Sequence, residues 1–198
     1  MAKPELLWLC SEWGEQDMNV KEAIQTRRSV RNYQPKAVEP EKLQALIEGV
    51  RLAPSANDTQ PWKLILVDDP AIREQIARTT FSKTVSFNEY SLEAPVLAVL
   101  AIEPDAIATQ IGGWLKKHPF SLIDIGIAAA HFCLQATDLG LGTCIMGWFN
   151  ESAIKKILHV PRATRIGVVI ALGYGVEPPG LYPKTRKAAS EMSSRNHY

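Results

Sequence analysis

Arg27-Arg28-Ser29-Val30-Arg31 is the stretch of this sequence around which the rest can be arranged. It brings three guanidinium groups and a hydroxyl into five residues, directly after a segment with a helical pattern, Val20 to Thr26. Guanidinium groups bind phosphate through paired hydrogen bonds and a permanent charge. A solvated basic turn would have the same composition, and the pentapeptide by itself favours that simpler interpretation.

The composition is that of an ordinary globular protein of 198 residues, with 46% apolar residues, 22% charged residues and a formal net charge of +1. A chain of this length can bury a sizeable core in one α/β or α+β domain. The small net charge excludes an overall field that would attract nucleic acid or an anionic membrane. Cys10, Cys133 and Cys144 are widely separated, which indicates buried thiols in a reducing compartment. We therefore expect a cytoplasmic protein with neither a signal peptide nor a membrane span.

Hydrophobic periodicity predicts helices and strands that do not form a regular βαβ series. The expected helices cover residues 19–26, 40–53, 69–80 and 121–139, with a further helix after Asn150. The expected strands cover residues 63–67, 96–102, 143–146 and 165–172. Residues 81–93 are expected to form a loop or a short helix, and residues 103–120 an irregular surface excursion. This order of elements predicts an α+β or mixed α/β domain.

The most apolar predicted helix, residues 121–139, has apolar side chains on every side. Such a helix is buried, either in the core or between subunits. The small residues that recur along one of its faces are Gly126, Ala130, Cys133 and Thr137. These residues would let another backbone approach closely. We assign no role to Asp124, His131 and Gln135, because polar groups in a buried helix are more often structural partners than catalysts.

No side chain presents itself for acid, base, nucleophilic or metal chemistry. The four histidines lie far apart, no His or Cys pair has metal-ligand spacing, and the GxSxG, Walker A and GxGxxG motifs are absent. Residues 53–62 form a loop between two prolines that is rich in amides and hydroxyls, and it is either a ligand-lining loop or a plain helix-to-strand connection. A pocket without a catalytic side chain suggests that a bound cofactor performs the chemistry.

Several motifs now stand in a characteristic order. The arginine stretch is followed by Ala53-Pro54-Ser55, by Gln60-Pro61-Trp62, by the segment from Gly140 to Gly147, and by Lys184 with Arg186. This succession resembles the nitroreductase family of FMN-dependent oxidoreductases. Each motif is weakly specific, but their order and spacing together outweigh the interpretation of the arginines as a solvated turn. The resemblance covers residues 18–187, which leaves residues 1–17 as an N-terminal extension and residues 188–198 as a C-terminal tail.

The resemblance implies an α+β fold of the nitroreductase type, an α-β-α sandwich in which helices flank a mixed central sheet. It also implies an intertwined homodimer with two FMN sites at the interface. The implied activity is ping-pong hydride transfer from NADH or NADPH, through flavin N5, to a small organic acceptor such as a quinone or a nitro compound. Relatives with other flavin chemistry (reductive dehalogenation, flavin fragmentation, azoline oxidation) share the resemblance. A flavin-binding regulatory protein without turnover is a further alternative.

The same resemblance implies which residues bind FMN. The positions that would serve the phosphate, the ribityl chain and the pyrimidine edge are Arg27, Arg28, Ser29 and Arg31, with Asn88 near the pyrimidine. The positions that would come from the partner chain are Pro54, Ser55, Ala56, Asn57 and Gln60. The positions along one face of the ring system are Ile145, Met146 and Gly147, and those that return to the phosphate are Lys184 and Arg186. No catalytic side chain and no metal is implied.

Two segments depart from the family pattern. In the proline-bracketed loop, Asn57 stands one position early and Asp58 occupies the usual asparagine place. The segment after Gly142 lacks the Pro-x-Glu-Gly sequence of many nitro-compound reducers, and Trp148 and Phe149 follow instead. This second departure argues against nitroaromatic compounds as the specific acceptor.

Overall fold

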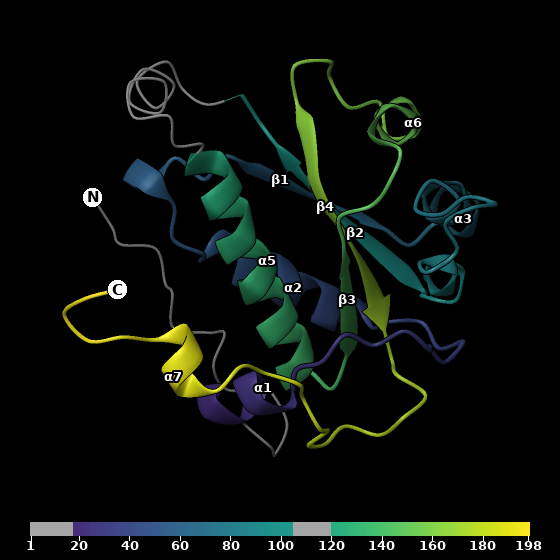
Figure 1. Ribbon diagram of the computed structural model, residues 1–198. Helices are drawn as coiled ribbons and strands as arrows, with labels where there is room; N and C mark the ends of the chain where they lie inside the picture. The colour runs from purple at the N-terminus through teal and green to yellow at the C-terminus, as the bar shows by residue number, and fades with distance from the viewer. Residues whose placement is uncertain (1–17, 105–119) are drawn as a thin grey trace, which may run out of the picture.

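A computed structural model describes residues 18–104 and 120–198 of the chain (Figure 1). The predicted extension, residues 1–17, and most of the predicted excursion at 103–120 lie outside these residues. The helices are α1 (Val20–Thr26), α2 (Pro40–Arg51), α3 (Pro70–Ala77), α5 (Phe120–Asp138), α6 (Glu151–Ile157) and α7 (Ala189–Met192). The short 3₁₀ helices are η1 (Ala56–Asp58) and η2 (Glu89–Leu92). The strands are β1 (Trp62–Val67), β2 (Val96–Ile102), β3 (Gly142–Met146) and β4 (Arg165–Gly173).

The four strands form one sheet in the order β1-β2-β4-β3. Every pairing between them is antiparallel. The described strands thus form an antiparallel sheet, which corrects the expectation of a mixed sheet. Among the described residues, a parallel pairing occurs only as the isolated bridge between Ser29 and Thr143. The apolar run of β2 shows that both faces of that strand are covered, but it carries no information on the direction of the neighbouring strands.

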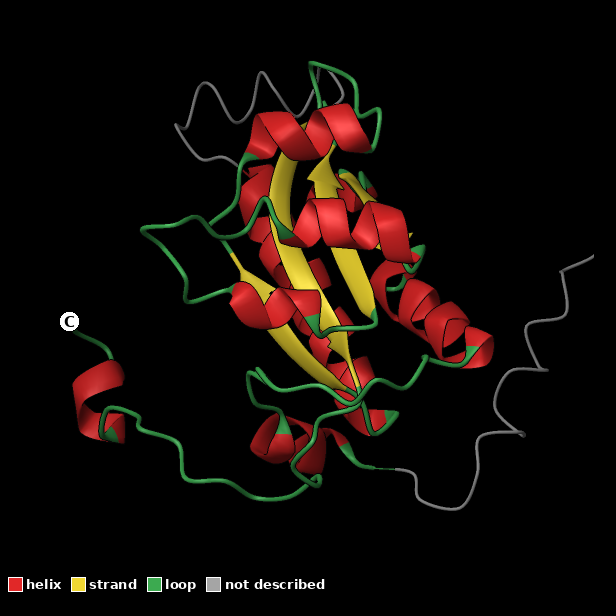
Figure 2. Cartoon of the chain, turned by 90° about the vertical axis from the view of Figure 1, so that its right-hand side faces the viewer, coloured by secondary structure: helices red, strands yellow, loops and turns green. Residues whose placement is uncertain are grey.

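Helices cover both faces of the sheet, as the expected sandwich requires (Figures 1 and 2). One core cluster joins α2 and α5 to the sheet through residues such as Leu46, Phe132 and Leu100. The other joins α3 and α6 to the opposite face through Ile76 and Ile154. Successive residues of β2 alternate between the two clusters, because side chains along a strand point to opposite faces.

Local signals explain most helix boundaries. The Asn19 side chain accepts from the Glu22 amide at 3.0 Å while the Glu22 carboxylate accepts from the Asn19 amide, which is a capping box at the start of α1. Helix α3 ends at Ala77, three residues before the expected end. The hydroxyl groups of Thr79 and Thr80 there donate to the carbonyls of Ile76 and Ala77 at 2.7 and 2.8 Å, and such local bonds compete with helix continuation.

Helix α5 crosses the sheet and is the longest helix of the described residues. Within that part of the chain it alone is long and apolar enough to cross a membrane, a test that the core helix of a soluble protein also passes. Its inner side packs in the core through Ile125, Phe132 and Ala136. Its other side is exposed in the single chain at Leu122 and Ile123. The expected all-round burial is thus half realised within one chain.

Candidate functional site

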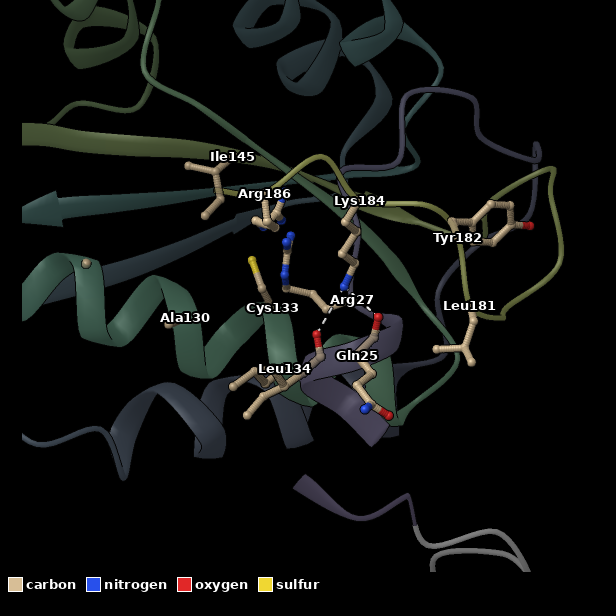
Figure 3. A pocket seen from close by; sticks show the side chains of 12 residues that line it. Gln25, Arg27, Ala130, Cys133, Leu134, Ile145, Leu181, Tyr182, Lys184 and Arg186 are labelled. Carbon is tan, nitrogen blue, oxygen red and sulfur yellow. Dashed lines mark hydrogen bonds between the residues drawn. The ribbon is translucent and has the colours of Figure 1, made fainter. Parts of the chain in front are cut away.

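A pocket of about 810 Å³ lies between α1, α5, β3 and the segment that follows β4 (Figure 3). The residues that line it are Ile24, Gln25, Arg27, Gly126, Ala130, Cys133, Leu134, Ile145, Leu181, Tyr182, Lys184 and Arg186. One wall is apolar or small, made by α5 and Ile145. Three cationic residues, Arg27, Lys184 and Arg186, lie together on the other side. The pocket therefore combines a basic end with an apolar wall.

The three cations differ in how their charge is compensated. The Lys184 ammonium donates to the carbonyls of Ile24 and Gln25 at 3.1 and 2.5 Å, so it caps the C-terminal end of α1. Burial, together with the charges of Arg27 and Arg186, lowers the pKa of Lys184. Among residues 18–104 and 120–198, no carboxylate forms an ion pair with any of the three. Their mutual repulsion favours an anion at this end of the pocket.

Residues 27–31 are held in place by β3. The Val30 amide donates to the Thr143 carbonyl at 2.9 Å, and Ser29 forms a parallel bridge with Thr143. The side chain of Val30 is buried directly over Gly142, where an added Cβ would come within 2.6 Å of Val30 Cγ2. Glycine at position 142 thus allows the arginine stretch to lie flat against the strand, which places Arg27 at the pocket.

The proline-bracketed loop contributes nothing to the pocket of its own chain. It has a defined shape nonetheless, with positive φ angles at Asn57, Asp58 and Gln60. The Gln60 amide donates to Ser55 Oγ at 2.8 Å, which closes the loop. Non-glycine residues with positive φ are strained and cluster at functional sites when the surroundings hold them. The geometry therefore favours a functional loop over a plain connection.

Asp124 of α5 holds this loop and was assigned no role from the sequence. Its Oδ1 accepts from the Ala56 amide at 3.1 Å, while its Oδ2 has no hydrogen-bond partner. The residue is 4% exposed. Burying a carboxylate oxygen without a hydrogen-bond partner costs folding free energy. The position of Asp124 beneath the strained loop therefore calls for a role beyond packing. The sequence signal was an acidic residue in an otherwise apolar helix.

Comparison with known proteins identifies the family. The profile of the Nitroreductase family matches residues 24–174. The chain belongs to the nitroreductase family. It is thereby an oxidoreductase, in agreement with the names of its relatives.

Relatives of this nitroreductase-family chain cover 80% or more of its length. A protein of Methanothermobacter thermautotrophicus, named as a putative NADH dehydrogenase/NAD(P)H nitroreductase, is 32% identical over 82% of this chain and 81% of its own. The crystal structure of a nitroreductase family protein from Clostridium novyi is 32% identical, with a TM-score of 0.72, over 80% of this chain and 86% of that one. The NADPH:FMN oxidoreductase of Vibrio harveyi has the same fold at 21% identity, with a TM-score of 0.72, over 90% of this chain and 77% of its own.

The four expected positions in the nitroreductase arginine stretch are divided by the structure. Arg27 lines the pocket, whereas Arg28, Ser29 and Arg31 do not. The Arg28 guanidinium is paired with Glu177 at 2.6 Å. The Arg31 guanidinium lies 5.9 Å from the centre of the Tyr90 ring, and Ser29 is exposed. An extended segment with Val30 pointing inward turns its neighbours outward.

Strand β3 separates the expected ring-face residues in a similar way. Ile145 is 47% exposed and lines the pocket. Met146 points to the other face and is buried in the core with Ile154, so only its backbone can face a ligand. Gly147 follows the strand and is exposed. The alternation of side chains along a strand accounts for this difference.

Asn88 is buried and its side-chain amide is occupied by the protein. Its Nδ2 donates to the carbonyls of Thr80 and Trp148 at 3.1 and 3.3 Å, and its Oδ1 accepts from the Tyr90 hydroxyl at 3.3 Å. Asn88 therefore fastens residues 81–93 to the segment after β3. The neighbouring rings of Phe87 and Trp148 meet edge to face at 6.4 Å and are both largely exposed.

Several pocket residues escaped the sequence analysis as site candidates. They are Ile24, Gln25, Leu134, Leu181 and Tyr182, together with Cys133, Gly126 and Ala130 from the small-residue stripe. Burial raises the pKa of the Cys133 thiol, although Thr143 and Arg27 act in the opposite direction. The small-residue stripe was a usable signal, because close approach of another backbone and close approach of a flat ligand require the same absence of side-chain bulk.

Proposed function

We propose that the pocket binds FMN and that the protein is an FMN-dependent oxidoreductase. It takes hydride from NADH or NADPH and passes it to a small organic acceptor such as a quinone or a nitro compound, the two substrates using the site in turn. The observation that carries the proposal is the convergence of Arg27, Lys184 and Arg186 at one end of a pocket with a small and apolar wall. FMN is the flavin named for the Vibrio harveyi oxidoreductase, which has the same fold.

The residues of the pocket fit the two ends of FMN. A phosphate monoester carries a charge of about −1.5 to −2 at neutral pH, and it needs several cationic donors when it is partly removed from water. The opposite side, formed by Ala130, Cys133 and Ile145, offers a surface without a charged group. A planar ring system can lie against such a surface without leaving a buried charge unpaired.

Each group of residues has a separate task in this proposal. The cations bind and orient the phosphate end, and the small residues of α5 let the ring approach the helix backbone. Bound FMN supplies the hydride chemistry itself, so no side chain has to move a proton in the hydride step. The chain contributes proximity and alignment of substrate and cofactor, which is a large part of catalysis in sites of this type.

We further propose a homodimer in the cytoplasm as the working form. The exposed face of α5, with Leu122, Ile123 and the small residues Gly126 and Ala130, offers a surface for a second copy. The second copy would bring the loop with Pro54, Ser55, Ala56, Asn57 and Gln60 to the flavin. The loop's defined shape, and the fact that none of its residues lines the pocket of its own chain, support that assignment.

Anaerobic reduction of the purified protein tests the proposal. A yellow protein whose flavin absorbance is bleached by NADH or NADPH, and recovers on addition of a quinone or nitro compound, is the expected result. The rate with each nicotinamide gives the donor preference, and a panel of acceptors gives the acceptor class. A colourless protein that takes up no added FMN would refute the proposal, and a flavoprotein without steady-state turnover would indicate a regulatory role.

A further inference from the structure

The segment after β4 forms one side of the pocket although it has almost no regular secondary structure. Leu181, Tyr182, Lys184 and Arg186 all line the pocket, and all lie between β4 and α7. Such a segment keeps its position only if side chains fasten it. The start of the segment is attached to residues 32–34, because the Val176 amide donates to the Asn32 carbonyl at 3.0 Å and Gln34 Nε2 donates to the Gly175 carbonyl at 2.7 Å. Farther along the segment, the attachments come from Lys184 and from Arg28.

Arg28 makes two contacts to this segment at once. Its Nη2 lies 2.6 Å from Glu177 Oε2, and its guanidinium carbon lies 3.9 Å from the centre of the Tyr182 ring. The Tyr182 hydroxyl donates to the Pro178 carbonyl at 2.7 Å, which closes residues 178–182 into a turn. Arg28 therefore contacts this turn on both sides, through the carboxylate of Glu177 just before it and through the aromatic face of Tyr182 at its end.

We propose that Arg28 is a positioning residue that clasps residues 177–182 and so holds Lys184 and Arg186 at the basic end of the pocket. The name "clasp" denotes Arg28, Glu177 and Tyr182. The proposal rests on the proposed FMN function for its consequence, but the clasp itself is a contact within the chain. It changes the role of Arg28 from a ligand of the cofactor to a support for two other ligands.

Charge compensation separates Arg28 from its neighbour Arg27. Arg27 lines the pocket and has no ion pair among the described residues, so its charge is available to an anion. The charge of Arg28 is neutralised by Glu177, and the Arg28 side chain is only 23% exposed. To reach a phosphate, Arg28 would have to abandon Glu177 and the Tyr182 ring. The two adjacent arginines therefore have different roles: Arg27 faces the anion, and Arg28 supports the segment that carries Lys184 and Arg186.

The test uses full-length Arg28→Ala, Glu177→Gln and the double variant, with two measurements on each. One is trypsin cleavage after Lys184 and Arg186 in the absence of flavin, with the sites assigned by mass spectrometry. The other is FMN affinity from quenching of flavin fluorescence. Glu74→Gln is the matched control, because it removes an exposed ion pair to Arg78 of the same 2.6 Å length on α3, away from the pocket.

We expect Glu177→Gln to raise the cleavage rate and weaken FMN binding by about threefold, and Arg28→Ala to change both by about tenfold because it also loses the ring contact. In the Arg28→Ala background, Glu177→Gln has no further effect. Glu74→Gln changes neither quantity.

A direct bond from Arg28 to phosphate gives the opposite sign. Removing the Glu177 charge would then release Arg28 and tighten FMN binding, and that result overturns the clasp. Unchanged cleavage in both single variants overturns it as well. If the wild-type protein takes up no FMN, the proposed function fails while the cleavage rates without flavin still decide the clasp.

Discussion

Gly142→Ala is the substitution that tests most directly how the fold positions the pocket. The added Cβ would lie 2.6 Å from Val30 Cγ2, 2.8 Å from Val30 Cβ and 3.0 Å from Val30 Cγ1. Carbon atoms in ordinary contact are about 3.5–4.0 Å apart, so the overlap is about 1 Å. Val30 is buried and branched at Cβ, and rotation about χ1 does not move its Cβ away. Residues 28–31 must therefore shift as a unit.

The expected loss of folding free energy has two sources, the overpacking around Val30 and the weakening of its hydrogen bond to β3. Forcing a methyl group into a filled core site costs about 1–3 kcal/mol. The shift also stretches the hydrogen bond, 2.9 Å long, that the Val30 backbone N–H donates to the Thr143 carbonyl. A displacement of about 1 Å at Arg27 would misalign it with a phosphate, and we expect FMN affinity to fall by at least about tenfold.

Urea unfolding and FMN titration of the same variant measure the two effects. Gly180→Ala is the control, since a Cβ at position 180 meets nothing within 4 Å. We expect the control to change the free energy of unfolding by no more than about 0.5 kcal/mol. If Gly142→Ala unfolds at the same urea concentration as the wild type and binds FMN equally well, the docking of Val30 over Gly142 does not position the arginine stretch.

Substitutions at three further positions test the role of a cation, the attachment of the loop and the dependence of stability on acid pH. Arg27→Ala should lower FMN affinity by about 10- to 100-fold with an unchanged unfolding midpoint, because only an anion uses this charge; unaltered flavin content in the purified variant would contradict the assigned role. Asp124→Ala should speed hydrogen exchange of the Ala56 amide by about tenfold or more, whereas Asp124→Asn, which keeps an acceptor, should leave the exchange rate unchanged. Equal exchange rates in the two variants would show that the side chain of Asp124 does not hold the loop. The hydrogen bond from Tyr174, followed by a backbone amide and Lys36, lowers the pKa of Glu39 to about 2 from 4.5, so its stabilisation is complete above pH 4.5 and is lost as the pH falls toward 2. Because the Glu39 side chain is 41% exposed, screening reduces this contribution to about 1 kcal/mol, and the stability gap between wild type and Tyr174→Phe in urea should narrow from pH 7 to pH 3; a gap that is constant with pH would refute the coupling.

The sequence predicted elements well where local chemistry decides them. Residues 96–102 form β2 with the expected boundaries, because a continuous apolar run bounded by polar residues leaves little choice. The cap at Asn19 and Pro40 at the first turn of α2 mark real helix starts. The direction of strand pairing was not predictable in this way. It depends on which strands meet, and no single strand carries that information.

The sequence predicted some of the residues that line the pocket, but not how the roles are divided among them. Arg27, Ile145, Lys184 and Arg186 were expected at the flavin and do line the pocket. Arg28 was expected there on the same grounds, yet Glu177, far along the chain, neutralises it. A motif specifies residue types at a spacing, whereas the partner of each charge depends on the folded chain.

The positive charges of the basic side chains are compensated to different degrees, so the net charge is concentrated at one point of the pocket. Arg28 is neutralised by a carboxylate, and Lys184 is partly satisfied by the carbonyls at the end of α1, while Arg27 and Arg186 have no ion pair in the described part of the chain. The uncompensated charge is therefore concentrated where Figure 3 shows the Arg27 side chain reaching toward Arg186. A charged phosphate gains most at that point, and an uncharged hydroxyl in its place gains little. The protein should consequently bind FMN more tightly than riboflavin mainly because of these two arginines. The clasp contributes to this preference indirectly, because it keeps Arg186 in place.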